Sequence, residues 1–273
     1  MLKQRVITAL LLLPVVLAVI IAAPAAWFLA LMAIVLLVCS WEYSQLAGVS
    51  SQSGRYLLTL AQAIIFAMLF WSRDHWATDI TLYLSICCVV WLLLFVRLPL
   101  YRPDIRPDNT YRLVSVATAI LSITTGCFAL SWLRLQPEGS WLILLLLLIV
   151  WASDTGAYFS GTMFGKRKLA AQISPGKTQA GLLGGLVAAP LVALLAASLM
   201  PLEPIEPVPL VLLSLLTALV SVGGDLMISL HKRTSGIKDS GNLLPGHGGM
   251  LDRLDSLLAA APFFALGLLV SGF

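Results

Sequence analysis

Long apolar runs, separated by short polar segments, follow one another along the whole 273-residue chain. Each run has the length and apolar character of a helix that crosses a bilayer, which needs about 20 residues. Nine such spans would take up about 180 residues, so no separate soluble domain is expected. The pattern predicts an all-α, polytopic transmembrane protein with about nine spans, at residues 6–23, 25–40, 56–71, 80–96, 113–133, 141–158, 182–200, 208–228 and 256–270.

The composition supports a membrane protein. Hydrophobic residues make up 59% of the chain and charged residues only 11%, whereas a soluble domain has about 25% charged residues. This excludes an ordinary soluble enzyme, a disordered chain and a coiled coil. We expect one integral membrane unit, with N-terminal helices in residues 1–150 and C-terminal helices with long cytoplasmic-side loops in residues 151–273. The cysteines lie in apolar runs without metal-ligand spacing, and we expect them to be core residues; they are Cys39, Cys87, Cys88 and Cys127.

The basic residues give the orientation. With nine spans, 15 of the 17 lysines and arginines fall on the side of the N-terminus, and Arg73 and Arg134 fall on the other. Basic loops remain on the cytoplasmic side of a membrane. The sequence therefore predicts a cytoplasmic N-terminus and long cytoplasmic loops at residues 97–112, 160–181 and 230–255. A multi-pass protein of the bacterial inner membrane, with its long polar loops facing the cytoplasm, fits this pattern.

Acidic residues indicate where chemistry takes place. Asp225 lies inside an apolar run, where a carboxylate costs a few kcal/mol unless it is paired or bound to a metal. It follows Gly223 and Gly224, which would let another backbone approach closely. The alternative is a helix-terminal acid that reaches the membrane interface. Asp154, Asp239, Asp252 and Asp255 are also predicted near the cytoplasmic ends of spans. The other eight acids lie in loops or at span ends, where solvation explains them: Glu42, Asp74, Asp79, Asp104, Asp108, Glu138, Glu203 and Glu206.

Asp252 and Asp255 are three residues apart, so they share one face if the segment is helical. Two carboxylates on one face repel each other unless a cation lies between them, and oxygen ligands suit Mg²⁺ better than zinc. The alternative is capping of the following helix, since acids favour its N-terminus. Capping suits Asp255, whereas a metal ligand is the favoured interpretation for Asp252.

The segment before the last span combines these acids with basic residues and a glycine-rich turn. Lys232, Arg233 and Lys238 supply positive charge, and the glycines around His247 allow backbone N–H groups to face an anion. This is the composition of a site for a metal and phosphates. His247 is either part of the turn or a phosphate donor, and His231 is expected at the membrane interface.

A second polar segment contains Ser174, Pro175, Gly176, Lys177 and Thr178. It does not meet the P-loop pattern, because Ala171 stands where that motif needs glycine and no buried strand precedes it. We expect Ser174 to cap a helix, Pro175 to take its first position and Lys177 to project from its first turn. The N-terminus of such a helix would bind an anion.

The motifs together resemble the signature of the phosphatidate cytidylyltransferase family, also called CDP-diacylglycerol synthases. The signature is a serine, then Lys-Arg, Lys-Asp and Pro-x-His-Gly-Gly-x-x-Asp-Arg-x-Asp at fixed gaps. It stands here as Ser229, Lys232-Arg233, Lys238-Asp239, Pro245, His247-Gly248-Gly249, Asp252-Arg253 and Asp255. Two upstream elements are similar as well: Asp154-Thr155-Gly156-Ala157-Tyr158 with Phe164-Gly165-Lys166, and Ser174 to Thr178. The resemblance is strong from about Trp151 to the C-terminus.

Two positions depart from the family pattern. Ala180 and Ile228 stand where the family often has acids. Both changes would weaken binding of a metal or nucleotide, so a low-activity or divergent paralogue that acts on another nucleotide-activated lipid is one alternative.

The resemblance implies a reaction of CTP with phosphatidic acid that gives CDP-diacylglycerol and pyrophosphate, with Mg²⁺ as cofactor. It implies that Asp225, Asp252 and Asp239 hold the metal. The implied catalytic residues are these three aspartates with Lys238 and His247. The implied substrate-binding residues are Ser174, Lys177, Thr178, Lys232, Arg233 and Arg253. Asp154 would orient a lysine or join the metal site.

Two alternatives come from other classes. A CDP-alcohol phosphatidyltransferase also uses membrane-embedded aspartates, but its Asp-Gly and Ala-Arg pattern is absent here. A transporter would spread polar residues over several spans, whereas here they gather in the C-terminal half. We expect membrane lipids and the two substrates as partners and no nucleic acid, with a homodimer as one alternative to a single chain.

Overall fold

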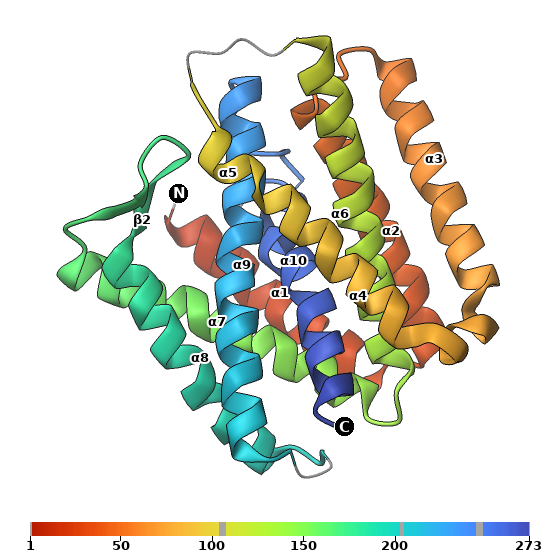
Figure 1. Cartoon of the computed structure of the whole chain (residues 1–273), viewed down its shortest axis with the longest axis vertical. Helices are drawn as coiled ribbons and strands as arrows, with labels where there is room; N and C mark the ends of the chain where they lie inside the picture. Colours follow the sequence, from red (N-terminus) through yellow and green to blue (C-terminus); the bar gives the residue numbers. More distant parts are fainter. Residues whose placement is uncertain (1, 104–107, 203–204, 244–247, 273) are drawn as a thin grey trace.

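The computed structural model describes residues 2–103, 108–202, 205–243 and 248–272, with side chains from residue 10 onward except that of residue 77. Helices dominate these residues and run alongside one another as a bundle (Figure 1). The helices are α1 (Leu2–Ala22), α2 (Ala25–Leu46), α3 (Gln52–Trp71), α4 (Trp76–Phe95), α5 (Arg97–Leu100), α6 (Asn109–Leu135), α7 (Gly139–Phe164), α8 (Gln179–Leu199), α9 (Pro207–Ser235) and α10 (Leu251–Val270), with a short 3₁₀ turn at Arg73–His75.

Eight candidate spans of sufficient length and apolarity are present in the described residues, and they coincide with the second to ninth predicted spans. The third of them, Thr78–Leu100, joins α4 and α5. The first predicted span coincides with α1, of which the apolar segment Leu10–Ala22 is shorter than the others. The all-α, polytopic prediction is confirmed, and the ninth span stays a prediction.

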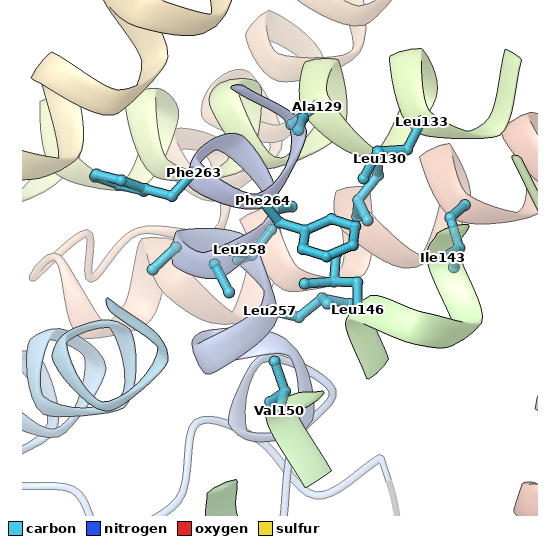
Figure 2. Packing of buried hydrophobic residues seen from close by; sticks show 14 of the residues in the cluster. Ala129, Leu130, Leu133, Ile143, Leu146, Val150, Leu257, Leu258, Phe263 and Phe264 are labelled. Atoms are coloured by element: carbon cyan, nitrogen blue, oxygen red, sulfur yellow. The ribbon is translucent and has the colours of Figure 1, made fainter. Parts of the chain in front are cut away.

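The hydrophobic core joins helices from both halves of the chain. Phe264 of α10 is fully buried, and Figure 2 shows its ring among leucines of α6, α7 and α10. Gly126 of α6 lets α10 approach closely, because a Cβ at this position would lie 2.5 Å from Leu258 Cδ2. All four cysteines are buried and free, as expected. The division of the chain near residue 150 stays a prediction.

Helices α7 and α8 meet along small residues. A Cβ at Gly184 would lie 1.8 Å from Ser160 Oγ and 2.7 Å from Gly156 O, and one at Gly156 would lie 2.6 Å from Ala188 Cβ. Small residues allow membrane helices to pack backbone against backbone, where van der Waals contact replaces the hydrophobic effect. This contact fixes α8 beside α7 at one edge of the bundle, while α3 forms the opposite edge (Figure 1).

A β-hairpin connects α7 to α8 and corrects one prediction. Strand β1 (Lys168–Ala170) pairs antiparallel with β2 (Ser174–Thr178), and Gln179 N donates to Arg167 O. Ser174 therefore does not cap a helix, and Lys177 lies in a strand rather than in a first helical turn. Thr178 is the cap of α8, because its hydroxyl accepts from Gly181 N at 3.0 Å. Because residues 174–178 form a paired strand, α8 begins at Gln179 and not near Pro175 as predicted.

The connections at the two ends of the bundle differ. The hairpin, the end of α9 and the start of α10 lie toward one end (Figure 1). At the other end Arg134 is 9% exposed and donates to Ala23 O and Ser140 Oγ, which ties α6 to the α1–α2 turn and to α7. The described residues of the predicted basic loops lie toward the hairpin end as well (Figure 1).

We expect Gly184→Ala to destabilise the protein by about 1–3 kcal/mol, because the added methyl group collides with Ser160 and the Gly156 carbonyl. The thermal unfolding midpoint in detergent measures this. Gly176→Ala is the control, because a Cβ at Gly176 meets no atom within 4 Å. Equal midpoints for the two variants would contradict the close α7–α8 contact.

Candidate functional site

The first charged pair of the site links the hairpin to α9. Lys177 Nζ lies 2.8 Å from Asp225 Oδ2, and it also donates to Val222 O at 3.2 Å. The other carboxylate oxygen of Asp225 accepts from Ser229 Oγ at 3.2 Å, one helical turn further on. Asp225 is therefore paired at the point where the apolar part of α9 ends, which resolves the cost of a carboxylate there.

The second charged pair links the end of α9 to the start of α10. Lys232 Nζ lies 2.9 Å from Asp252 Oδ1, and only 7% of the Asp252 side chain is exposed. Helix α9 ends at Gly236 in the left-handed conformation, with φ of 70°, and Ile237 N donates back to Lys232 O. This glycine cap satisfies carbonyls of the last turn and fixes the turn that carries Lys232.

The loop between α9 and α10 closes on the second oxygen of Asp252. Ser240 N donates to Asp252 Oδ2 at 2.9 Å and Gly249 N donates to the same oxygen at 3.1 Å. Gly248 has φ of 82°, a conformation that favours glycine. A Cβ at Gly248 would lie 2.7 Å from Asp252 Oδ2 and 3.4 Å from Asp239 Cβ. Asp239 thus lies beside Asp252, although its side chain is exposed.

Further aspartates lie next to these pairs. A Cβ at Gly224 would lie 2.6 Å from Asp255 O, which confirms the close backbone approach expected beside Asp225. Asp255 is 7% exposed, interacts electrostatically with Asp225 and accepts from Ser256 N at 2.7 Å. The capping interpretation of Asp255 is wrong, because Met250 is the N-cap of α10 and Asp255 lies inside the helix. Lys232 interacts electrostatically with both Asp225 and Asp255, so the two charged pairs form one cluster.

Two hollows meet beside this cluster. A cavity of about 220 Å³ is lined by Asp154, Lys177, Thr178 and Asp225 among others. An apolar groove of about 620 Å³ lies between α5, the hairpin, α8 and α9. They share Leu169, Leu182 and Val222 as lining residues. The arrangement places charged groups directly beside an apolar surface.

The remaining predicted residues lie around the cluster. Arg233 donates from Nε to Ile173 O at 3.0 Å and so supports the hairpin. Lys238 and Arg253 are exposed, and Arg253 interacts electrostatically with Asp154. Ser174 begins β2 and is partly exposed. His247 lies outside the described residues.

Sequence reasoning missed two buried groups. Glu42, expected to be solvated, is 5% exposed, because it accepts hydrogen bonds from the start of α10. His231, expected at the interface, is fully buried: its Nδ1 lies 2.9 Å from Met227 O and its Nε2 lies 3.2 Å from Arg97 Nη1. For Glu42 the sequence held one signal, because it is the single charged residue of the described helix α2.

The carboxylates suit a hard cation in chemical type. No group of three close acidic, histidine or cysteine side chains that could hold a metal occurs among the described residues. Mg²⁺, however, is commonly bound through one or two carboxylates together with substrate phosphates. Asp225 and Asp252 both interact with Lys232. This pair of carboxylates fits a cation that is shared with a phosphate ligand.

The fold and site define a polytopic membrane protein with a charged cluster suited to phosphates at one end of its bundle. The Cytidylyltransferase family matches residues 3–270. Phosphatidate cytidylyltransferase of Pseudomonas aeruginosa is 39% identical over 289 residues, covering 100% of this chain and 98% of that protein. The Haemophilus influenzae protein of the same name is 33% identical over 286 residues, covering 97% of this chain and 98% of that protein.

A shorter match reaches higher identity. Phosphatidate cytidylyltransferase of Brucella suis is 44% identical over 131 residues, or 48% of each chain. The chain therefore belongs to the cytidylyltransferase family, and the resemblance seen in the sequence is confirmed.

We expect Lys232→Met to destabilise the protein by about 3–5 kcal/mol, because it leaves the buried Asp252 carboxylate without its cation. Adding Asp252→Asn to this variant should recover part of the loss, since the unpaired charge is removed. The unfolding midpoints of the two single variants and the double variant in detergent form a double-mutant cycle. Lys238→Met, at an exposed position, is the control; additive effects of the two substitutions would contradict the pairing.

Proposed function

We propose that the protein transfers a cytidylyl group from CTP to phosphatidic acid and so forms CDP-diacylglycerol and pyrophosphate. The observation that carries this proposal is the junction of the charged cavity with the apolar groove. A substrate with a phosphate head and acyl tails matches such a junction, because its head needs cations and its tails need an apolar surface. Family membership and the full-length match to phosphatidate cytidylyltransferases support the same reaction.

In the proposed reaction an oxygen of the lipid phosphate attacks the α-phosphorus of CTP. The new bond joins this oxygen to the α-phosphorus, and the bond to the bridging oxygen of the β-phosphate breaks, so pyrophosphate leaves with that electron pair. The lipid phosphate is largely dianionic near neutral pH, since its second pKa is about 6. It needs little help from a base, so positioning and charge neutralisation carry the catalysis.

We assign to Lys177 and Lys232 the binding of the substrate phosphates. Both point into the aspartate cluster, and each can move its ammonium group from a carboxylate to a phosphate oxygen at short range. Arg233, Lys238 and Arg253 surround the cluster and supply further positive charge. Thr178 fixes the start of α8, and Ser174 starts the strand that carries Lys177.

We assign Mg²⁺ to Asp225 and Asp252, with Asp239 as a further ligand or a supporting acid. When bound, the cation neutralises phosphate oxygens and orients the triphosphate. Asp255 lies beside Asp225. Asp154 lines the charged cavity. Both carboxylates would therefore add negative electrostatic potential near the cation. His247 stays a predicted phosphate donor of the glycine-rich turn.

The same proposal covers the location of the protein. The surplus of basic residues at the hairpin end supports a cytoplasmic N-terminus and a cytoplasmic site, where CTP is available. We place the chain in the inner membrane of a bacterium, with membrane lipids as surroundings and no role for nucleic acid. A homodimer stays a prediction.

Of the two family departures, Ile228 is 1% exposed and belongs to the hydrophobic core. An acid at this position would be buried here, so the isoleucine fits its surroundings. Ala180 lies in the first turn of α8 and is partly exposed. Cytidylyl transfer to phosphatidic acid therefore stays the favoured function. The assay below also tests the alternative, a divergent paralogue that uses another nucleotide.

We expect purified protein to move label from α-labelled CTP into the lipid fraction when phosphatidic acid and Mg²⁺ are present. Label from γ-labelled CTP should appear in pyrophosphate, and EDTA should abolish both. Asp225→Asn should lower the rate by at least about 100-fold, because cation binding and the place of Lys177 both depend on this carboxylate.

Asp74→Asn is the matched control, because Asp74 is exposed and lies on the 3₁₀ turn after α3. Absence of lipid-bound label from folded wild-type protein would overturn the proposed reaction. Label that reaches lipid only with another nucleotide would identify a divergent paralogue.

We expect Ala171→Trp to raise the KM for long-chain phosphatidic acid several-fold, because the indole would fill the apolar groove that Ala171 lines. The KM for CTP should stay the same, since Ala171 does not line the charged cavity. Initial rates at varied lipid and fixed CTP, and the reverse, separate the two constants. A higher KM for CTP alone would argue against lipid in this groove.

A further inference from the structure

Glu42 of α2 is a buried carboxylate that accepts hydrogen bonds from the connection between α9 and α10, of which residues 236–243 and 248–250 are described. Only 5% of the residue is exposed. Its Oε1 accepts from Met250 N at 3.1 Å, and its Oε2 accepts from Leu251 N at 2.8 Å and from Ser240 Oγ at 3.0 Å. The three donors come from the first part of this connection and from the start of α10, so one side chain joins the two segments.

The hydrogen bonds that Glu42 accepts also cap the N-terminus of α10, which receives no capping bond from its own N-cap side chain. Met250, at the N-cap position, makes no side-chain capping bond, and the N–H groups of Met250 and Leu251 begin the helix. A carboxylate at a helix N-terminus is stabilised by these N–H groups and by the helix dipole. Within the described ranges no lysine or arginine forms an ion pair with Glu42. The helix start is thus the partner of this buried charge.

Ser240 connects Glu42 to the charged cluster. Its hydroxyl donates to Glu42, and its backbone N–H donates to Asp252 Oδ2 at 2.9 Å. The loop backbone also fits tightly against Glu42: a Cβ at Gly241 or at Gly249 would lie 2.4 Å from a Glu42 carboxylate oxygen. A displacement of Glu42 is therefore transmitted to both N–H groups that hold Asp252.

We propose that Glu42 is a positioning residue for the nucleotide site. It sets the place of the loop that carries Lys238 and Asp239 and the orientation of Asp252, and it does so without touching substrate. The inference rests on the proposed function for its kinetic consequence, whereas the loop anchoring itself is independent of it. Residues 1–150 thereby contribute directly to a site whose recognised motifs all lie in residues 151–273.

Glu42→Gln tests the proposal with little change of shape. In either orientation the amide NH₂ of glutamine replaces an acceptor and faces the N–H of Met250 or of Leu251, so at least one bond is lost. We expect kcat/KM for CTP to fall by about 10- to 100-fold, as for other groups that orient ligand residues. The KM for phosphatidic acid should change by less than about twofold, because the apolar groove does not include this loop. Ser240→Ala, which removes one of the three donors, should give a smaller loss of the same kind.

Ser40→Ala is the matched control, because Ser40 is buried on the same helix and its hydroxyl has no hydrogen-bond partner among the described residues. It should leave both constants at the wild-type values. Amide hydrogen exchange at Ser240, Gly249, Met250 and Leu251 should be faster in Glu42→Gln than in Ser40→Ala.

Each outcome decides the proposal. Wild-type kinetics in Glu42→Gln would overturn it, and so would an equal loss in Ser40→Ala or equal changes in the KM of both substrates. Unchanged exchange at the four amides would overturn the anchoring itself. If the wild-type protein forms no CDP-diacylglycerol, the proposed function fails, and the exchange measurement still decides whether Glu42 anchors the loop.

Discussion

The site depends on one constraint: a carboxylate at the edge of the apolar part of a membrane protein needs a cation or several hydrogen-bond donors. Asp225 has Lys177 and Ser229, and Asp252 has Lys232 and two backbone N–H groups. Lys177 comes from the hairpin, and Ser229 from the next turn of α9. Lys232 comes from the end of α9, and the two N–H groups come from the loop that follows. Satisfying the aspartates therefore draws the hairpin, α9, the following loop and α10 together.

This assembly also explains why the charged residues suit phosphate chemistry. Lys177 and Lys232 both interact electrostatically with Asp225 and Asp255, and these negative charges offset the repulsion between the two lysines. Glu42 adds a further negative group, which accepts hydrogen bonds from the backbone of Met250 and Leu251 at the start of α10. Pairing within the protein thus fixes the positions of the charged groups that the proposed reaction would use.

Much of this was predictable from the sequence. Hydrophobic runs of membrane-spanning length predicted the helices, because backbone hydrogen bonds must be satisfied within a bilayer. The unusual position of Asp225 and the glycines before it predicted a close approach of another helix, and Asp255 of α10 provides it. The resemblance of the motifs predicted the family that the full-length match confirms.

Other features were not predictable because they depend on long-range contacts. The segment from Ser174 to Thr178 has the residues of a helix start, but strand pairing with Lys168–Ala170 makes it part of a hairpin. Glu42 lies about 200 residues from the loop it holds, and a single sequence carries no trace of that pairing. His231 is buried for the same reason, because its partner Arg97 comes from the end of another span.

The glycine contact between α7 and α8 has a geometric consequence for the hairpin that joins them. At Gly156 and Gly184 the two helices approach so closely that a Cβ on either glycine would collide with the facing helix. Both ends of the hairpin therefore start from helices whose separation is set by this backbone contact. Asp154 of α7 and Lys177 of the hairpin line the same cavity, so the width of that cavity depends on how closely these two backbones meet.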